Sequence, residues 1–266
     1  KWKELGKHIS NFIPLAPEEK IISSMILDDP NGYVIMTTKQ GVSKRTQLNE
    51  LIVSRYTKTI NAMKLKDGDE MVSAVKDNGR AIFVTEGGYY LNIDSNEIPI
   101  VGAKASGVRG INVKEDEVVT CISPDGNSDY LLIVTNKNTA KRIRISELEV
   151  GSRAKKGSTL MKKVKTNPYK VMNVLPVSIQ NTIGLRKDTD ISEIKTTEIG
   201  IMDLSSTGSS ISKHKLDEAF IIADVIEAKL DETKQPEPKK EEIELPKKKE
   251  AAQELTIDDF IDDFKL

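Results

Sequence analysis

The sequence predicts an all-β fold in which four similar units are arranged as propeller-like blades. Each unit opens with a short, mostly apolar run that has the length and composition of a β-strand. These runs are Val34–Thr37, Ala81–Val84, Leu131–Val134 and Thr182–Leu185. Each is closed by one further residue, namely Thr38, Thr85, Thr135 or Arg186.

Two further positions recur at fixed distances from these runs. A glutamate follows twelve residues after each closing position, at Glu50, Glu97, Glu147 and Glu198. Ten residues later the last three units carry Gly107, Gly157 and Gly208, whereas the first carries Ile60. The resulting periods are 47, 50 and 51 residues. A repeat of this length that is made of short strands is typical of the blades of a propeller-like array.

Each unit also has a second half, in which a polar turn precedes another apolar strand. The strands expected here are Met71–Val75, Val118–Ile122, Val171–Leu175 and Phe220–Val225. The preceding turns are rich in Asp, Asn, Gly and Pro, which supply turn geometry. Because the acidic residues of these turns recur with the repeat, turn formation explains them better than general acid catalysis.

The repeat predicts where the domains and blades begin and end. Residues 1–30 match only the second half of the pattern, and the complete blades are expected at about 31–77, 78–127, 128–180 and 181–231. The array would expose strand edges unless the fragment belongs to a longer protein or its last unit closes against its first. Residues 232–250 are mostly Lys, Glu and Pro and are expected to be a disordered linker. Residues 251–266 form an acidic amphipathic segment, which is either a partner-binding helix or a solubilising tail.

The charge of the chain is balanced overall but unevenly distributed. Lys plus Arg number 40 against 41 Asp plus Glu, yet from residue 232 onward 7 basic residues face 11 acidic ones. Between Thr135 and Lys165 there are ten Lys or Arg residues and two Glu. Such a cluster favours a polyanionic partner, and the alternative is a solvated face.

Basic residues recur at similar points of successive units, which predicts a discontinuous basic track along one rim. Lys44-Arg45 and Lys141-Arg142 occupy the same two places in the first and third units. The complete set of expected DNA-binding residues is Lys44, Arg45, Arg55, Lys58, Lys104, Arg109, Lys141, Arg142, Arg144, Arg153, Lys155, Lys156, Lys162 and Lys163. Such a track can hold DNA through its phosphates without reading bases, and a curved one would bend the duplex. The alternative is that these side chains keep the blade edges soluble.

Residues that could carry catalysis are scarce. The two histidines, His8 and His214, lie among Lys or Ser residues, and neither a metal-binding spacing nor a phosphate-binding glycine loop is present. The single cysteine, Cys121, lies in an apolar run and is expected to be a small buried hydrophobe. We therefore expect no enzyme activity, cofactor or metal in this fragment. No apolar stretch is long enough to span a membrane and no signal peptide opens the chain, which predicts a cytoplasmic location.

Three stretches of the chain resemble a known family. They are residues 1–11 (KWKELGKHISN), 41–46 (GVSKRT) and 102–108 (GAKASGV). They are similar to the C-terminal domain of the A subunits of bacterial type IIA topoisomerases. The first stretch looks most like topoisomerase IV of Gram-positive bacteria, and the A subunit of gyrase comes second.

This resemblance implies a β-pinwheel, in which neighbouring blades exchange strands and double-stranded DNA binds around the basic outer rim. It also implies partners in the complete enzyme, namely the ATPase B subunit together with the other domains of the A subunit, and a nucleoid-associated location. The DNA-cleaving tyrosine of the family belongs to another domain. The basic wrapping loop of gyrase, of the form Gln-Arg-Arg-Gly-Gly-Lys-Gly, does not occur in this sequence. A DNA-binding and DNA-bending domain of topoisomerase IV is therefore expected, and the alternatives are a gyrase wrapping domain and a protein-interaction scaffold.

Overall fold

The computed structural model describes residues 9–11, 13, 15–25, 30–54 and 59–222. Contacts divide the chain into residues 1–224 and 225–266, and all described residues belong to the first unit. The described residues contain β-strands and short 3-10 turns, and no α-helix. The predicted linker 232–250 and acidic segment 251–266 lie outside the described residues, and the predicted blade boundaries stay predictions.

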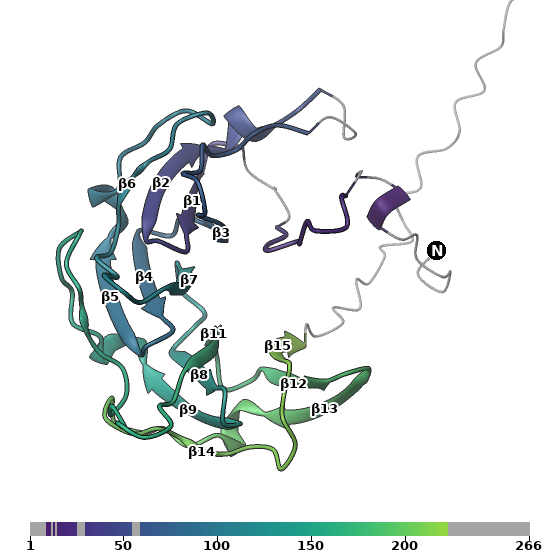
Figure 1. The fold of residues 1–266 in the computed structure, drawn as a ribbon, viewed down its shortest axis with the longest axis vertical. Helices are drawn as coiled ribbons and strands as arrows, with labels where there is room; N and C mark the ends of the chain where they lie inside the picture. Colours follow the sequence, from purple (N-terminus) through teal and green to yellow (C-terminus); the bar gives the residue numbers. More distant parts are fainter. Residues whose placement is uncertain (1–8, 12, 14, 26–29, 55–58, 223–266) are drawn as a thin grey trace, which may run out of the picture. The chain divides into compact units, whose positions relative to one another are not determined.

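Four antiparallel sheets follow one another along the chain (Figure 1). The first has the order β3-β1-β2-β6, with β1 Tyr33–Thr38, β2 Val42–Gln47, β3 Met71–Lys76 and β6 Val108–Arg109. The second has the order β10-β5-β4-β7, with β4 Arg80–Thr85, β5 Tyr89–Asp94, β7 Val118–Ile122 and β10 Ser158–Thr159. The third has the order β11-β8-β9-β14, with β8 Tyr130–Thr135, β9 Thr139–Arg144, β11 Val171–Val177 and β14 Ser209–Ser210. The fourth has the order β13-β12-β15, with β12 Thr182–Lys187, β13 Asp190–Lys195 and β15 Glu218–Ile222.

In each of the first three sheets, one of the two edge strands comes from the following unit. Strand β6 pairs with β2, β10 with β5, and β14 with β9. At the other edge, β3, β7, β11 and β15 contact one another in turn. The all-β prediction is confirmed, and so is the strand exchange that the family resemblance implied.

The recurring glycine marks the point where an exchanged strand crosses its neighbour. Gly107, Gly157 and Gly208 all have a positive φ, between +82° and +89°. A Cβ on Gly157 would lie 2.0 Å from the carbonyl oxygen of Tyr90, so only glycine allows the backbones to approach this closely. Ile60 occupies this place in the first unit, and no described strand of a preceding sheet pairs there.

The recurring glutamate marks a 3-10 turn at the end of each hairpin. These turns are η2 (Leu48–Leu51), η3 (Ser95–Glu97), η4 (Ile145–Glu147) and η5 (Thr196–Glu198). In the second half of the repeat unit, acidic residues of the turns accept backbone hydrogen bonds, which agrees with the predicted role in turn formation. Asp69 accepts a hydrogen bond from the backbone N–H of Gln40 at 3.0 Å, and Asp116 accepts one from Gly87 at 2.9 Å.

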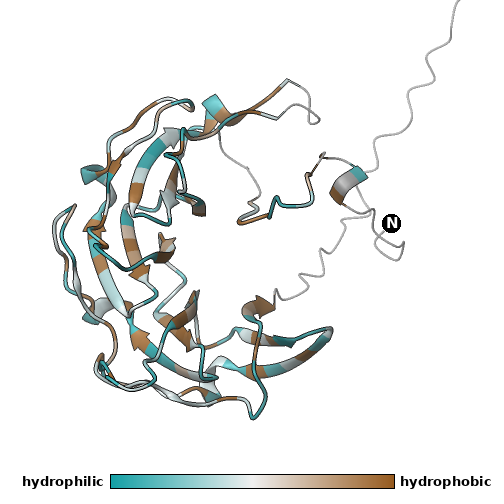
Figure 2. Cartoon of the chain, in the orientation of Figure 1, coloured by the Kyte–Doolittle hydropathy of each residue, from teal (hydrophilic) through white to brown (hydrophobic). Residues whose placement is uncertain are grey.

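The core lies in layers between neighbouring sheets, which explains why the hairpin strands are apolar without interruption. In β4, Ala81 and Phe83 pack toward the first sheet, whereas Ile82 and Val84 pack toward the third. Successive side chains of a strand point to opposite faces, so a strand covered on both faces needs apolar residues throughout. Brown apolar segments accordingly recur along the strands in Figure 2. Cys121 belongs to one of these layers, where burial raises the pKa of its thiol to about 12 and confirms its expected structural role.

The half unit before the first sheet differs from the pattern that the sequence predicts. Its polar turn is present, since the N–H of Glu19 donates to the carbonyl of Ala16 at 3.0 Å. Residues 21–25, however, form no strand, and Ile21 is 59% exposed. The hydroxyl of Ser23 donates to the carbonyl of Ala74 in β3, which links this segment to the first sheet.

Candidate nucleic-acid interface

The two Lys-Arg pairs predicted to bind DNA are buried, and this part of the predicted track is wrong. Lys44 and Lys141 are 0% and 1% exposed, and Arg45 and Arg142 are 7% and 6% exposed. All four lie in the middle of β2 or β9, strands that are covered on one side by a hairpin partner and on the other by an exchanged strand. They cannot reach the phosphates of a bound duplex.

The buried lysines hold the segment that leads into each exchanged strand. The Lys44 ammonium donates to the carbonyls of Gly102 and Ala103 at 2.9 and 2.7 Å. The Lys141 ammonium donates to the carbonyls of Leu160, Asp203 and Leu204 at 2.7–3.0 Å. Burial nevertheless lowers the pKa of Lys141 to about 8. Each lysine thus satisfies backbone oxygens that have no partner in a strand.

The neighbouring arginines bind the end of the next 3-10 turn. Arg45 Nε donates to the Ile98 carbonyl at 2.8 Å, and Arg142 Nε donates to the Ile199 carbonyl at 2.6 Å. Asn92 stands at the same place in the second sheet and donates to the Leu148 carbonyl at 3.0 Å. In the three sheets that receive an exchanged strand, this position thus supplies a side-chain hydrogen-bond donor, and the Lys-Arg periodicity reflects folding.

The exchanged loops, by contrast, bring an exposed and a half-buried cation of two units together. Arg153 Nη1 donates to the Arg109 carbonyl at 2.8 Å, and the N–H of Ala154 donates to the Gly110 carbonyl at 2.7 Å. Glu97 of η3 accepts a hydrogen bond from the Arg153 N–H at 2.7 Å, which fixes the start of the loop. Seven cations from three successive units form what we call the basic exchange surface: Lys64, Lys66, Arg109, Arg153, Lys155, Lys156 and Lys163.

One aromatic residue, Tyr89, contacts two cations of this surface. Lys156 Nζ donates to the Tyr89 hydroxyl at 2.9 Å and lies 4.0 Å from the centre of its ring. Lys163 Nζ lies 4.4 Å from the same centre. Hydrogen bonding from these two ammonium groups lowers the pKa of Tyr89. Tyr89 was not among the residues predicted from the sequence, because no other unit has a tyrosine at this place to mark it as part of a pattern.

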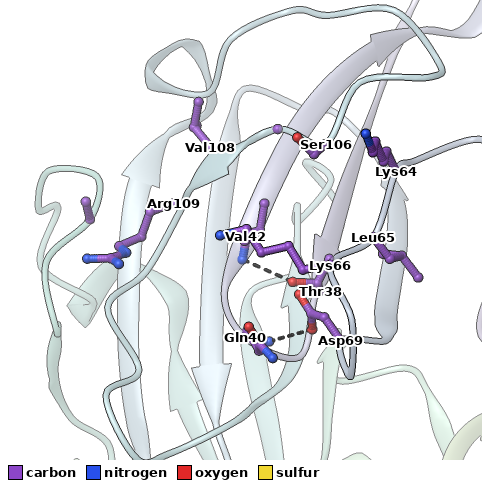
Figure 3. A pocket seen from close by; sticks show the side chains of 12 residues that line it. Thr38, Gln40, Val42, Lys64, Leu65, Lys66, Asp69, Ser106, Val108 and Arg109 are labelled. Atoms are coloured by element: carbon purple, nitrogen blue, oxygen red, sulfur yellow. Dashed lines mark hydrogen bonds between the residues drawn. The ribbon is translucent and has the colours of Figure 1, made fainter.

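A pocket of about 430 Å³ is lined by three further cations of the surface (Figure 3). Lys64 and Lys66 line it from the turn before β3, and Arg109 lines it from β6. Ala154 of the third unit closes it. Lys64 and Lys66, which follow Ile60 in the first unit, were missed in the sequence because only the strand exchange brings them beside Arg109.

The remaining predicted residues lie elsewhere or outside the described ranges. Lys104 and Lys162 are exposed on the loops before β6 and after β10. Arg144 is exposed but pairs with Glu147 at 2.7 Å, at the end of β9 away from the exchanged strand β14. Arg55 and Lys58 lie outside the described residues. Within the described ranges, no cluster of His, Cys, Asp and Glu could hold a metal ion, and no helix is long and apolar enough to cross a bilayer.

Comparison with known proteins places these features in a family. The family model described as the DNA gyrase C-terminal domain, beta-propeller, matches residues 32–76, 80–123 and 129–178. The A subunit of DNA topoisomerase 4 from Bacillus subtilis (strain 168) is 34% identical over 214 residues, which are 79% of this chain and 27% of that protein. The corresponding protein of Staphylococcus epidermidis is 32% identical over 176 residues, which are 65% of this chain and 22% of that protein. The chain thus spans about a quarter of the length of these relatives.

Solved structures give the same result. A crystal structure of the C-terminal domain of DNA topoisomerase IV has a TM-score of 0.76 at 30% identity, covering 84% of this chain and 72% of that one. A DNA gyrase A C-terminal domain has a TM-score of 0.71 at 22% identity, covering 84% and 77%, and shows likeness of fold. Because the family model matches three of the four hairpin units and the curated relatives extend beyond them, the chain belongs to the family of DNA gyrase C-terminal β-propeller domains.

Proposed function

We propose that this chain is the DNA-binding C-terminal domain of the A subunit of a topoisomerase IV. In this proposal it binds duplex DNA without sequence preference and bends it, steering a segment for strand passage in decatenation and relaxation. The observation that carries the proposal is the basic exchange surface, where three successive units contribute seven cations.

The chemistry of this surface suits the DNA backbone. Among the described residues, the ion pairs are formed by Lys39, Arg45, Arg144, Lys170 and Arg186, so the cations of the exchange surface remain available. Duplex DNA carries one negative charge per about 1.7 Å of its axis, so a row of cations can displace many counterions. Phosphate contacts of this kind position a duplex but carry no sequence information.

Bending follows from the way the blades are repeated. Blades of a propeller are related by rotation, so their outer edges do not lie on a straight line. A duplex that touches the exchange loops of successive blades must therefore curve. Curvature over a short site costs roughly 1–6 kcal/mol, which additional phosphate contacts have to offset.

The wider assignments rest on the relatives. We propose that the chain works with an ATPase B subunit, together with the other domains of its own A subunit, in an ATP-dependent type II enzyme whose cleavage chemistry lies in another domain. A cytoplasmic, nucleoid-associated location belongs to the same proposal. The alternative of a gyrase-like wrapping domain is supported by the name of the matching family model.

Fluorescence anisotropy with a labelled 40-base-pair duplex tests the proposal. We expect binding that weakens steeply as the salt concentration rises and that differs little between duplexes of unrelated sequence. A duplex carrying a donor and an acceptor dye at its ends should show higher energy transfer when bound. Absence of binding at low salt would reject the proposal and favour a protein-interaction scaffold. Binding without a change in energy transfer would reject bending alone.

A further inference from the structure

A pocket of about 440 Å³ surrounds Tyr89 at the edge of the second sheet. Its lining includes Tyr89, Lys114, Lys156 and Lys163, together with Glu115 and Asp116. One oxygen of Asp116 is already engaged by the N–H groups of Gly87 and Glu117 at 2.9 and 2.8 Å. The pocket therefore presents three cations around one aromatic ring, against two carboxylates of which one is held in a turn.

The backbone holds Lys156 and Lys163 close to this ring. Lys156 directly precedes Gly157, where the exchanged strand crosses β5 in contact with Tyr90. Lys163 follows the buried Met161, which packs against Gly88, and the N–H of Leu160 donates to the Gly88 carbonyl at 2.7 Å. Strand β10 lies between the two lysines and pairs with Tyr89 and Tyr90.

We propose that Lys156 and Lys163 form a binding site for a single phosphate of the DNA backbone, and that Tyr89 is the residue that positions them. An ammonium group over a tyrosine ring is attracted by the ring's electrons, so one ring can hold two long, otherwise mobile side chains together. Two lysines held in this way lose less conformational freedom when they bind one phosphate. This inference rests on the proposed DNA-binding function and assigns one subsite within it.

The arrangement is specific to the second sheet among the four hairpins. The residues that correspond to Tyr89 at the start of the outer hairpin strand are Val42, Thr139 and Asp190. None of them offers an aromatic ring. The subsite is therefore expected to make the second sheet a preferred anchoring point for the duplex.

Affinity measurements on single and combined variants test the positioning role. Tyr89→Leu removes the ring without removing charge and should weaken DNA binding roughly three- to tenfold. Tyr89→Phe keeps the ring and should lose less than about twofold. In a Lys156→Ala/Lys163→Ala background, Tyr89→Leu should have no further effect, because its role depends on the two lysines. Lys187→Ala, which removes an exposed charge from β12 in the fourth sheet, is the matched control for charge.

A second readout reports directly on the subsite. The two ammonium groups lower the pKa of Tyr89, so a phosphate that draws them away should raise that pKa again. The difference in phenolate absorbance between the wild-type chain and Tyr89→Phe, titrated with and without duplex, isolates this group. The expected result is a higher pKa in the presence of DNA.

The outcomes separate this inference from the proposed function. If the wild-type chain binds DNA but Tyr89→Leu binds equally well and the pKa of Tyr89 does not move, the subsite is wrong and the domain function stands. If Tyr89→Leu weakens binding equally in the presence and absence of the lysines, the positioning role is wrong. If the wild-type chain fails to bind DNA, both proposals fall.

Discussion

The ammonium group of Lys141 donates a hydrogen bond to the carbonyl oxygen of Leu204, 63 residues later in the chain, at 2.9 Å. Leu204 lies in the segment that leads into the exchanged strand β14, and Lys141 lies in β9, with which β14 pairs. Lys141, which the sequence suggested as a DNA-binding residue, therefore links two neighbouring units, and we call this link the Lys141 clamp.

Replacement of this clamp should cost stability rather than DNA affinity. Lys141→Met keeps much of the side-chain volume but removes the donor to the carbonyls of Leu160, Asp203 and Leu204, of which that of Leu160 is buried. This should lower the free energy of unfolding by on the order of 2 kcal/mol. Lys155→Met, at an exposed position, should change it by less than about 0.5 kcal/mol. Urea unfolding of the two variants measures the difference, and equal stabilities would contradict the clamp.

The buried ammonium group also predicts a pH dependence. Burial lowers the pKa of Lys141 from 10.5 to about 8, so between these values the unfolded chain binds a proton that the folded chain has released. Raising the pH through this window therefore favours the folded state. The free energy of unfolding of the wild-type chain, minus that of Lys141→Met, should rise between pH 8 and 10.5. A flat difference would show that the folded lysine keeps its ordinary pKa, and a falling one that its pKa is raised; either would contradict the account.

The crossing at Gly157 should tolerate no side chain. Gly157→Ala places a Cβ 2.0 Å from the Tyr90 carbonyl oxygen at a φ of +82°, so the exchanged strand must move away from β5. We expect a loss of about 1–3 kcal/mol or more in unfolding free energy, measured by urea titration. Gly126→Ala, which meets no atom within 4 Å, should be close to neutral. Equal effects at both glycines would argue against a tight crossing.

Charges of the basic exchange surface should dominate the salt dependence of DNA binding. Arg153→Ala/Lys155→Ala/Lys156→Ala should reduce the slope of log affinity against log salt by about 3, since each phosphate contact contributes about 0.9. Arg144→Ala, which removes a cation already paired with Glu147 at the other end of β9, should leave the slope unchanged. Anisotropy titrations at several salt concentrations compare the two, and the reverse ranking would move the interface to the end of β9.

Much of the fold follows from the sequence because the repeat fixes the position of each strand. The apolar runs became β1, β4, β8 and β12, and the glycines became crossing points where a Cβ would meet a carbonyl. The strands and the glycine crossings depend on burial and on local backbone geometry, and both are visible in the sequence as a repeated pattern of apolar residues and glycines.

The candidate DNA-binding interface was predictable only in part, because the charge of a residue does not show whether its side chain is buried. Lys44 and Arg153 look alike in the sequence, yet one is enclosed between strands and the other lies on a loop. The hydrogen bond from Arg153 to the Arg109 carbonyl depends on strand exchange, and so does the one from Lys156 to Tyr89. Strand exchange joins units whose repeat is about 50 residues. Only the family resemblance indicated that exchange.

Protection of lysines by DNA tests the central claim most directly. The wild-type chain is treated with an amine-acetylating reagent, with and without a duplex, and the modification of each lysine is measured by mass spectrometry. DNA should protect Lys155, Lys156 and Lys163, whereas the exposed Lys187 and Lys195 of the fourth sheet should react equally in both samples. Protection of Lys187 and Lys195, with Lys155, Lys156 and Lys163 still reactive, would contradict the basic exchange surface as the DNA-binding site.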